Sequence, residues 1–207
     1  MERLLFRPFG PSIAKVRIPN EILNYLNKYT ESKLNENLEE KKINAGDKLA
    51  GNVSQEIIIN DEAMKESGFS DFLMKECANW IYSYNKQKIT KFDLIASWIV
   101  RQFQNEYNPL HMHNGHVSGV GYLKLPTVLG NTKQKNKPNK NGDLQLVHGS
   151  KTFLSESIFN IKPKVGDFYF FPHYLMHVVY PFCDTDEERR SVSFNAYVDH
   201  EIYASTD

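Results

Sequence analysis

NPLHMHNGHVSGVGYLKL, residues 108–125, is the stretch that decides the fold prediction. Two short runs of β-prone residues flank Asn114-Gly115, a dipeptide that is typical of tight hairpin turns. We therefore expect a strand over residues 110–113 and a second strand over residues 117–125 that runs back beside the first. Two glycines in the second strand weaken it as a packing element and leave room for another group close to its backbone.

His111 and His113 stand two positions apart in the first of these strands. Residues at this spacing project from the same face of a strand, so two imidazoles can bind one metal ion. A third histidine, His177, opens a later β-prone run after a Pro-containing corner. A single histidine in a strand is usually structural or solvated, but this combination predicts a metal site formed by His111, His113 and His177.

Four other histidines are interpreted as structural or solvated side chains: His116, His148, His173 and His200. Among them His116 is the most credible substitute ligand, because it lies just beyond the Asn-Gly turn.

The rest of the chain divides into a helical part and a strand-rich part. Apolar residues recur at the helical period over residues 69–84, and a second helical pattern opens at Asn20. Short β-prone runs cover residues 4–9, 13–18, 92–107, 143–147, 167–171, 177–180 and 191–198. This order predicts a mainly β protein with flanking helices, an α+β chain in which a sandwich or barrel has helices packed on one face.

We expect a single domain over residues 1–207. In this interpretation residues 1–90 form a supporting region of helices and strands, and residues 91–200 form the catalytic core.

The charge balance argues against a nucleic-acid-binding protein. Lys+Arg and Asp+Glu each number 25, so the formal net charge is +0, whereas nucleic-acid binding usually shows as a basic excess. The one basic run, KQKNKPNK at residues 133–140, is typical of a solvated loop and could act as a lid over the site.

The sequence favours a cytoplasmic protein. Its two cysteines, Cys77 and Cys183, form no disulfide framework, and Cys77 sits in a helical pattern as a small core residue. The first residues show no signal peptide, and no apolar run reaches the roughly 18 residues that a membrane helix needs.

Arg190 begins the apolar run RSVSFN. A guanidinium buried at the start of such a strand needs a carboxylate partner, and a bound dicarboxylate would serve. The acidic residues of the preceding loop are the competing partners: Asp184, Asp186, Glu187 and Glu188. The adjacent Arg189 could be the arginine that faces this loop.

Five motifs follow one another in a fixed order over roughly residues 98–198: H-x-H, S-G-V-x-Y-L, G-D-x-x-x-F-P, L-x-H-x-V and R-S-x-S-F-N. Together they resemble the 2-oxoglutarate/Fe(II)-dependent oxygenases, and most closely a subgroup from marine bacteria and phages that is distantly similar to prolyl hydroxylases. The resemblance implies a double-stranded β-helix, the jelly-roll or cupin-like fold. It also implies a dioxygenase that hydroxylates an unactivated C–H bond of an unknown small molecule or peptide side chain, using dioxygen and releasing succinate and CO2.

Site residues follow from the same resemblance. His111, His113 and His177 match the positions that bind Fe(II). Arg190 matches the residue that binds the C5 carboxylate of 2-oxoglutarate, and Tyr122 matches a tyrosine that can hydrogen-bond the same carboxylate.

One position departs from the family pattern. The usual metal ligands are two histidines and one carboxylate, and here His113 stands where the carboxylate is expected. In another register His113 is the first ligand and Gly115 takes the carboxylate position, which leaves that position vacant as in related halogenases.

Two other functions remain open at this stage. A cupin-like dioxygenase could use a three-histidine metal without 2-oxoglutarate, and a binding module could keep the fold without catalysis. The sequence does not set the oligomeric state, and a homodimer is compatible with it.

Overall fold

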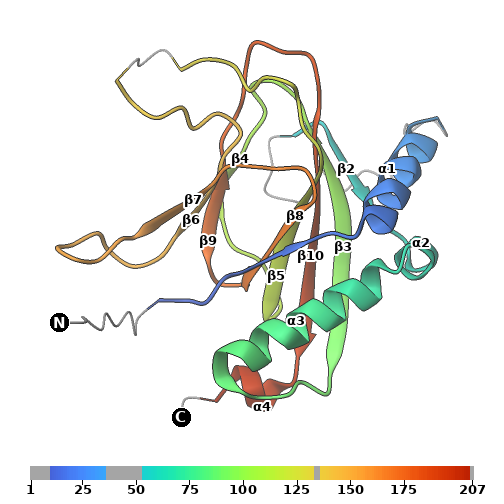
Figure 1. The fold of residues 1–207 in the computed structure, drawn as a ribbon, viewed down its shortest axis with the longest axis vertical. Coiled ribbons are helices and arrows are strands. Elements are labelled where there is room, and N and C mark those ends of the chain that lie inside the picture. Colours follow the sequence, from blue (N-terminus) through green and yellow to red (C-terminus); the bar gives the residue numbers. More distant parts are fainter. Residues whose placement is uncertain (1–9, 36–52, 133–135, 206–207) are drawn as a thin grey trace, which may run out of the picture.

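The computed structural model describes residues 10–35, 53–132 and 136–205, and it places two β-sheets face to face with helices on one side (Figure 1). In chain order the elements are β1 (Ala14–Arg17), α1 (Asn20–Asn35), β2 (Gln55–Ile58), α2 (Asp61–Glu66), α3 (Phe69–Asn85), β3 (Phe92–Gln102), β4 (Asn108–His111), β5 (Val117–Lys124), β6 (Leu144–Val147), β7 (Ile158–Ile161), β8 (Asp167–Pro172), β9 (Met176–Val179), β10 (Arg189–Val198) and α4 (His200–Tyr203).

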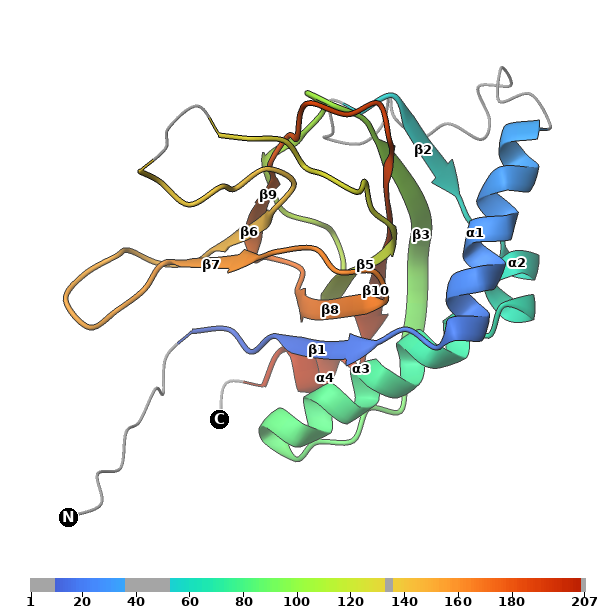
Figure 2. The same cartoon turned by 45° about the horizontal axis from the view of Figure 1, so that its top comes forward.

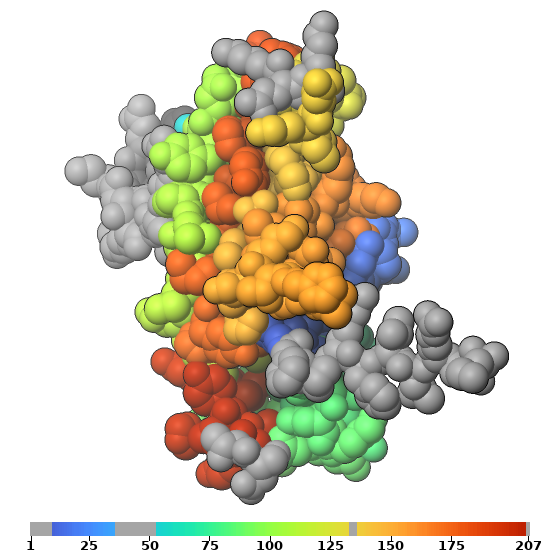
Figure 3. All heavy atoms as spheres, turned by 90° about the vertical axis from the view of Figure 1, so that its left-hand side faces the viewer, coloured from blue at the N-terminus to red at the C-terminus, as the bar shows by residue number. Residues whose placement is uncertain are grey.

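The two sheets form a double-stranded β-helix. The larger sheet has the strand order β1-β8-β5-β10-β3-β2, and the smaller sheet has the order β4-β9-β6-β7. Figure 2 shows how the smaller sheet lies across from the larger one, with the β6–β7 hairpin projecting outward; the same yellow-to-orange segment lies across the middle of the face in Figure 3. The prediction of a mainly β, jelly-roll protein with flanking helices is confirmed.

Helices α1 and α3 cover the outer face of the larger sheet. Leu26, Phe69 and Leu73 are each 0% exposed and belong to one core cluster with Phe168 and Phe194 of that sheet. The apolar residues that recur at the helical period place these side chains on one stripe, so the helix can bury them against the sheet. The predicted helix over residues 69–84 is confirmed as α3, and Cys77 is buried in the same cluster, as expected.

The predicted hairpin between residues 110–113 and 117–125 is wrong. β4 pairs with β9 in the smaller sheet, whereas β5 lies between β8 and β10 in the larger one. The turn at Gly115 (φ 102°) therefore carries the chain from one sheet to the other. A Cβ atom at this glycine would lie 2.9 Å from the carbonyl oxygen of Ala196, so the crossing also passes close to β10.

The glycines of β5 make room for core rings. A Cβ atom at Gly119 would lie 2.6 Å from Cε1 of Phe194, and one at Gly121 would lie 2.4 Å from Cδ2 of Phe168. The space that the two glycines were expected to leave near the backbone is therefore filled on this side by phenylalanines of the core.

Several short elements were not predicted from the sequence: β2, α2, β7 and α4. Each is four to six residues long, and β7 is exposed at three of its four positions, so its hydrophobic pattern is weak. The expected strand over residues 4–9 lies outside the described residues. No helix within the described ranges combines the length and apolar character needed to cross a membrane.

Candidate metal centre

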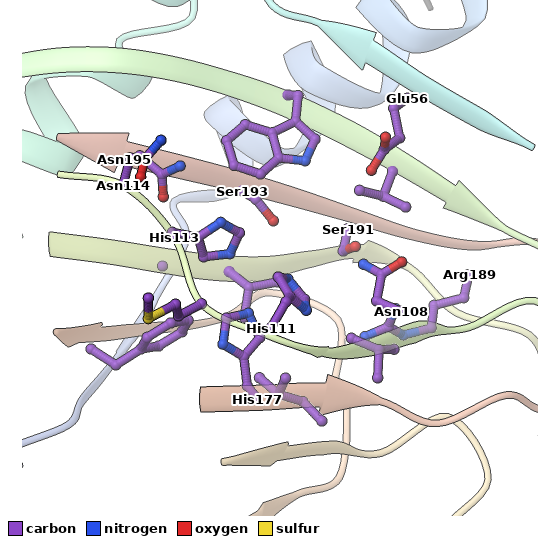
Figure 4. Close-up of a pocket in the computed structure, with 18 residues that line it drawn as sticks. Glu56, Asn108, His111, His113, Asn114, His177, Arg189, Ser191, Ser193 and Asn195 are labelled. Atoms are coloured by element: carbon purple, nitrogen blue, oxygen red, sulfur yellow. The ribbon is translucent and has the colours of Figure 1, made fainter. Parts of the chain in front are cut away.

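Three histidines converge between the two sheets, as the sequence predicted. His111 on β4 is paired in register with His177 on β9, and their ring centroids are 4.2 Å apart. The ring of His113 lies 5.0 Å from that of His111 and 4.9 Å from that of His177. One potential ligand atom from each ring lies within 4.8 Å of the others, a spacing that suits a single metal ion (Figure 4).

Backbone carbonyls orient two of the rings. Nδ1 of His111 lies 2.7 Å from the carbonyl oxygen of Pro109, and Nδ1 of His177 lies 2.9 Å from that of Leu175. A neutral imidazole that donates its Nδ1 proton to a carbonyl keeps an unprotonated Nε2, which is the atom a metal needs. Both bonds span two residues, so the local backbone of each strand fixes the tautomer.

His113 is held differently, because it lies just past the end of β4. Its amide donates to the carbonyl of His173 (3.1 Å), and its ring meets the edge of Trp98 at a centroid distance of 5.8 Å. The backbone bond and the indole together hold the third imidazole toward the other two.

Two of the rings, those of His113 and His177, sit in an environment that disfavours positive charge. Burial, with the neighbouring imidazoles, lowers the pKa of His113 to about 3, and it lowers the pKa of His177 to about 4. Both are therefore neutral at physiological pH, the protonation state in which an imidazole binds a metal.

We expect the metal-free protein to lose stability as the pH falls below about 6.5. Both histidines have a pKa of 6.5 when unfolded and a lower pKa when folded, so the unfolded state binds the protons first. The part of the stability that comes from these neutral rings is complete above pH 6.5 and declines as the pH falls, toward about 4 for His177 and about 3 for His113. Urea unfolding of the His177→Gln variant between pH 7.5 and 5 should show a shallower pH dependence than the wild type, whereas exposed His148→Gln should follow the wild type; parallel curves for all three proteins would contradict this.

A cavity of about 300 Å³ adjoins the histidines. Its polar lining comes mainly from the inner face of the larger sheet, and Figure 4 shows Glu56, Asn108, Arg189, Ser191, Ser193 and Asn195 around it. Apolar side chains, among them Phe171, Leu144 and Val179, close the rest of the wall. The cavity can therefore hold a small polar molecule next to a metal while limiting the access of water.

Arg189, and not Arg190, lines this cavity. Neighbouring residues of a strand face opposite sides. Arg190 points away from the cavity and pairs with Glu188 of the preceding loop and, at 2.6 Å, with Glu31 of α1. The expectation that Arg190 faces a bound dicarboxylate is corrected: its partners are Glu188, one of the loop acids that competed for it, and Glu31. The alternative that Arg189 faces that loop is not what the structure shows, because Arg189 lines the cavity.

Arg189 is 2% exposed and donates to Oε1 of Gln102 at 2.8 Å. Its guanidinium lies 5.1 Å from the ring centre of Tyr122, whose side chain is fully buried. Within the described residues, Nε of Arg189 and the hydroxyl of Tyr122 have no hydrogen-bond partner. Burial lowers the pKa of Arg189, an effect that Tyr122 and the buried Asp143 oppose. Tyr122 is thus placed beside an arginine as expected, but the arginine is Arg189.

The other histidines lie outside the metal cluster. Nδ1 of His116 is 3.1 Å from the carbonyl oxygen of Val198, and its ring stacks on Tyr203 at 3.9 Å. His116 therefore belongs to the attachment of α4 and is not a substitute ligand in this arrangement. Gly115 lies against Ala196, which gives no support to the register that leaves the carboxylate position vacant.

His173 links the C-terminal helix to the third imidazole. Its Nδ1 lies 3.0 Å from the carbonyl oxygen of His113, and its Nε2 lies 2.8 Å from the hydroxyl of Tyr203 on α4. A neutral ring that donates from Nδ1 and accepts at Nε2 satisfies both contacts.

Replacing Tyr203 with phenylalanine should lower the unfolding free energy by about 1 kcal/mol, because the hydrogen bond to His173 is lost while the stack on His116 remains. Tyr203→Ala should lose roughly 0.5–1.5 kcal/mol more with the stack. Chemical denaturation measures both, and equal stability of the phenylalanine variant and the wild type would show that this bond contributes nothing.

The sequence did not single out three residues that line the cavity: Arg189 as a cavity residue, Glu56 and Trp98. Alternation along β10 could have indicated Arg189, because Ser191, Ser193 and Asn195 share its face. No signal marked Glu56, since β2 itself was not predicted.

Comparisons with known proteins show what this part of the chain is similar to. Residues 96–195 match the family model described as "Putative 2OG-Fe(II) oxygenase". A Pseudomonas putida prolyl-4-hydroxylase aligns with 15% identity over 88% of this chain and 91% of its own, with a TM-score of 0.55. The collagen prolyl hydroxylase of Paramecium Bursaria Chlorella virus-1, in complex with 2-oxoglutarate, aligns with 16% identity over 89% and 94%, with a TM-score of 0.54.

A third similar structure contains a metal. HygX from Streptomyces hygroscopicus, with nickel and 2-oxoglutarate bound, aligns with 10% identity over 89% of this chain and 81% of its own, with a TM-score of 0.54. At these identities the likeness shows the fold alone. A search of curated proteins finds no match. The matched residues 96–195 include all three histidines, Tyr122 and Arg189, so the part of the chain that forms this site is similar to the 2-oxoglutarate/Fe(II)-dependent oxygenases.

Proposed function

We propose that the protein is a dioxygenase that hydroxylates an unactivated C–H bond of a small molecule or a peptide side chain and releases succinate and CO2 from 2-oxoglutarate. The observation that carries this proposal is the cavity that joins three converging imidazoles to a buried arginine. A metal site alone would fit many functions, but a metal site beside a buried guanidinium fits a cosubstrate with a free carboxylate.

The residues present suit iron(II). His111, His113 and His177 would hold it, since imidazole nitrogens are good ligands for iron. The lowered pKa values of His113 and His177 leave each of these rings a lone pair, and carbonyls fix the orientation of the rings of His111 and His177. Relative to two histidines and a carboxylate, the site has one negative charge fewer, so we expect weaker binding of the divalent ion. When bound, iron with 2-oxoglutarate supplies oxidative decarboxylation of the cosubstrate and oxidation of a substrate C–H bond.

Arg189 and Tyr122 would bind the distal carboxylate of 2-oxoglutarate. Arg189 can donate from its guanidinium, whose Nε has no partner in the described residues, and the Tyr122 hydroxyl is a second buried donor. Buried donors gain from a charged acceptor, because leaving them unsatisfied is costly. This pair would fix one end of the cosubstrate, and the apolar walls would limit water near the other.

Because His113 replaces the usual carboxylate ligand, a second function is compatible with the site. A three-histidine metal is also the arrangement expected of a cupin-like dioxygenase that does not use 2-oxoglutarate, or of a module that has lost catalysis. The buried guanidinium favours the first proposal over both.

Titrating 2-oxoglutarate into the Mn(II)-loaded full chain distinguishes these functions. We expect saturable binding in the calorimeter, and we expect iron-dependent release of succinate under air that a chelator stops. Metal binding without 2-oxoglutarate binding would favour the cupin-like dioxygenase. Absence of metal binding would leave the non-catalytic module.

A further inference from the structure

The third imidazole, that of His113, is held in place by a residue outside the metal cluster. β4 ends at His111, so its pairing with β9 does not extend to His113. The amide of His113 donates to the carbonyl of His173 at 3.1 Å, and Nδ1 of His173 lies 3.0 Å from the carbonyl oxygen of His113. The peptide groups on both sides of the His113 Cα atom are therefore bound to one residue, His173.

The ring of His173 is held in turn by the C-terminal helix. Its Nε2 lies 2.8 Å from the hydroxyl of Tyr203 on α4, the helix that follows β10 (Figure 1). The Tyr203 ring stacks on His116 with an interplanar angle of 4°, and the amide of His116 donates to the carbonyl of Ala196 on β10 at 2.9 Å. The larger sheet therefore fixes Tyr203, which presents a hydroxyl donor to His173.

This donor selects the tautomer of His173. A neutral imidazole carries one N–H group and one acceptor nitrogen. When Nε2 accepts the proton of the Tyr203 hydroxyl, Nδ1 carries the ring proton and donates it to the carbonyl of His113. In the other tautomer the lone pair of Nδ1 would face that carbonyl oxygen, and the contact would be repulsive. The hydrogen bond from α4 therefore keeps the contact between His173 and His113 attractive.

We propose that Tyr203 and His173 are positioning residues for the third metal ligand. Tyr203 sets the tautomer of His173, and His173 holds the backbone of His113 so that its imidazole reaches the metal. This inference rests on the metal site of the proposed function and goes beyond it, because it makes the C-terminal helix part of what determines the coordination of the metal. The rings of His111 and His177 are oriented instead by carbonyls two residues away.

The affinity for Mn(II) and the visible absorption of bound Co(II) test this inference in the full chain. Replacing His173 with leucine should weaken Mn(II) binding about tenfold or more, the usual loss when a group that orients a ligand is removed. Tyr203→Phe should weaken it severalfold. At saturating Co(II) both variants should alter the visible bands, because these bands report on the number and arrangement of the ligands.

Two further variants separate positioning from general destabilisation. Tyr25→Phe is the matched control, because it removes a hydroxyl that donates to Glu66 at 2.6 Å between α1 and α2. It should leave the Mn(II) affinity and the Co(II) bands unchanged. His173→Asn keeps an N–H group near the position of Nδ1, and it should restore most of the affinity that His173→Leu loses.

A double-mutant cycle determines whether His173 acts through His113. Residues that act through one another have non-additive effects. In a His113→Ala background the third ligand is already missing, so His173→Leu should cause no further loss of Mn(II) affinity. If His173→Leu does not fold, Tyr203→Phe takes its place in the cycle.

Two outcomes overturn the inference: an equal loss of Mn(II) affinity in both backgrounds, or wild-type affinity and Co(II) bands in the His173 and Tyr203 variants. Either result, with metal and 2-oxoglutarate still bound by the wild type, leaves the proposed function intact. A wild type that binds no metal removes the proposed function and this inference with it.

Discussion

Replacing His177 with alanine is expected to abolish metal-dependent succinate release. His177 is the most buried of the three imidazoles, and its backbone-bonded Nδ1 presets Nε2 for the metal. Losing a group that only orients a ligand costs roughly 10–100-fold in metal affinity, so losing the ligand itself should cost more. Equilibrium dialysis with Mn(II) measures the effect, and exposed His148→Ala is the control.

Replacing His113 with aspartate should have the opposite effect on Mn(II) affinity. It places a carboxylate where the family pattern expects one, adds one negative charge to the ligand set, and should tighten Mn(II) binding relative to the wild type. If His177→Ala binds Mn(II) like the wild type, or if His113→Asp and His113→Ala bind it equally well, these histidines do not form the metal site.

Replacing Arg189 with leucine is expected to weaken 2-oxoglutarate binding by about 30-fold or more, because truncating one partner of a buried charge pair costs roughly 2 kcal/mol or more. The fold should tolerate this change, since Arg189 has Gln102 as its one hydrogen-bond partner among the described residues. Calorimetric titration of 2-oxoglutarate into the Mn(II)-loaded variant gives the affinity, and chemical denaturation gives the stability.

Arg190→Leu should lower the stability of the protein and leave its affinity for 2-oxoglutarate unchanged. Arg190 is 1% exposed and pairs with the buried Glu188, so its loss should lower the unfolding free energy by about 3–5 kcal/mol, with 2-oxoglutarate affinity retained in the folded protein. If that variant is too unstable to titrate, Glu31→Gln removes the more exposed partner of the same arginine. Loss of 2-oxoglutarate affinity on changing Arg190 or Glu31, with none on changing Arg189, would reinstate the original expectation.

Arg189 and Arg190 show what could not be decided from the sequence alone. The motif R-S-x-S-F-N placed a basic residue at the start of β10, but which of two adjacent arginines faces inward depends on the register of the strand. Shifting a strand by one residue exchanges its two faces. The register is set by pairing with β3 and β5, which lie far away in the sequence. The hairpin was mispredicted for a related reason, since local turn signals do not reveal which sheet receives each strand.

The sequence by itself determined the strand-rich second half, the helix α3 and the closeness of His111 to His113, because periodicity and a two-residue spacing are local properties. Only the tertiary structure decided that Arg189 faces the cavity, that His116 serves the C-terminal helix, and that Glu56 reaches the same cavity as the histidines. These placements depend on pairing between distant strands and on burial. Both are properties of the packed sheets, and no short stretch of the chain encodes them.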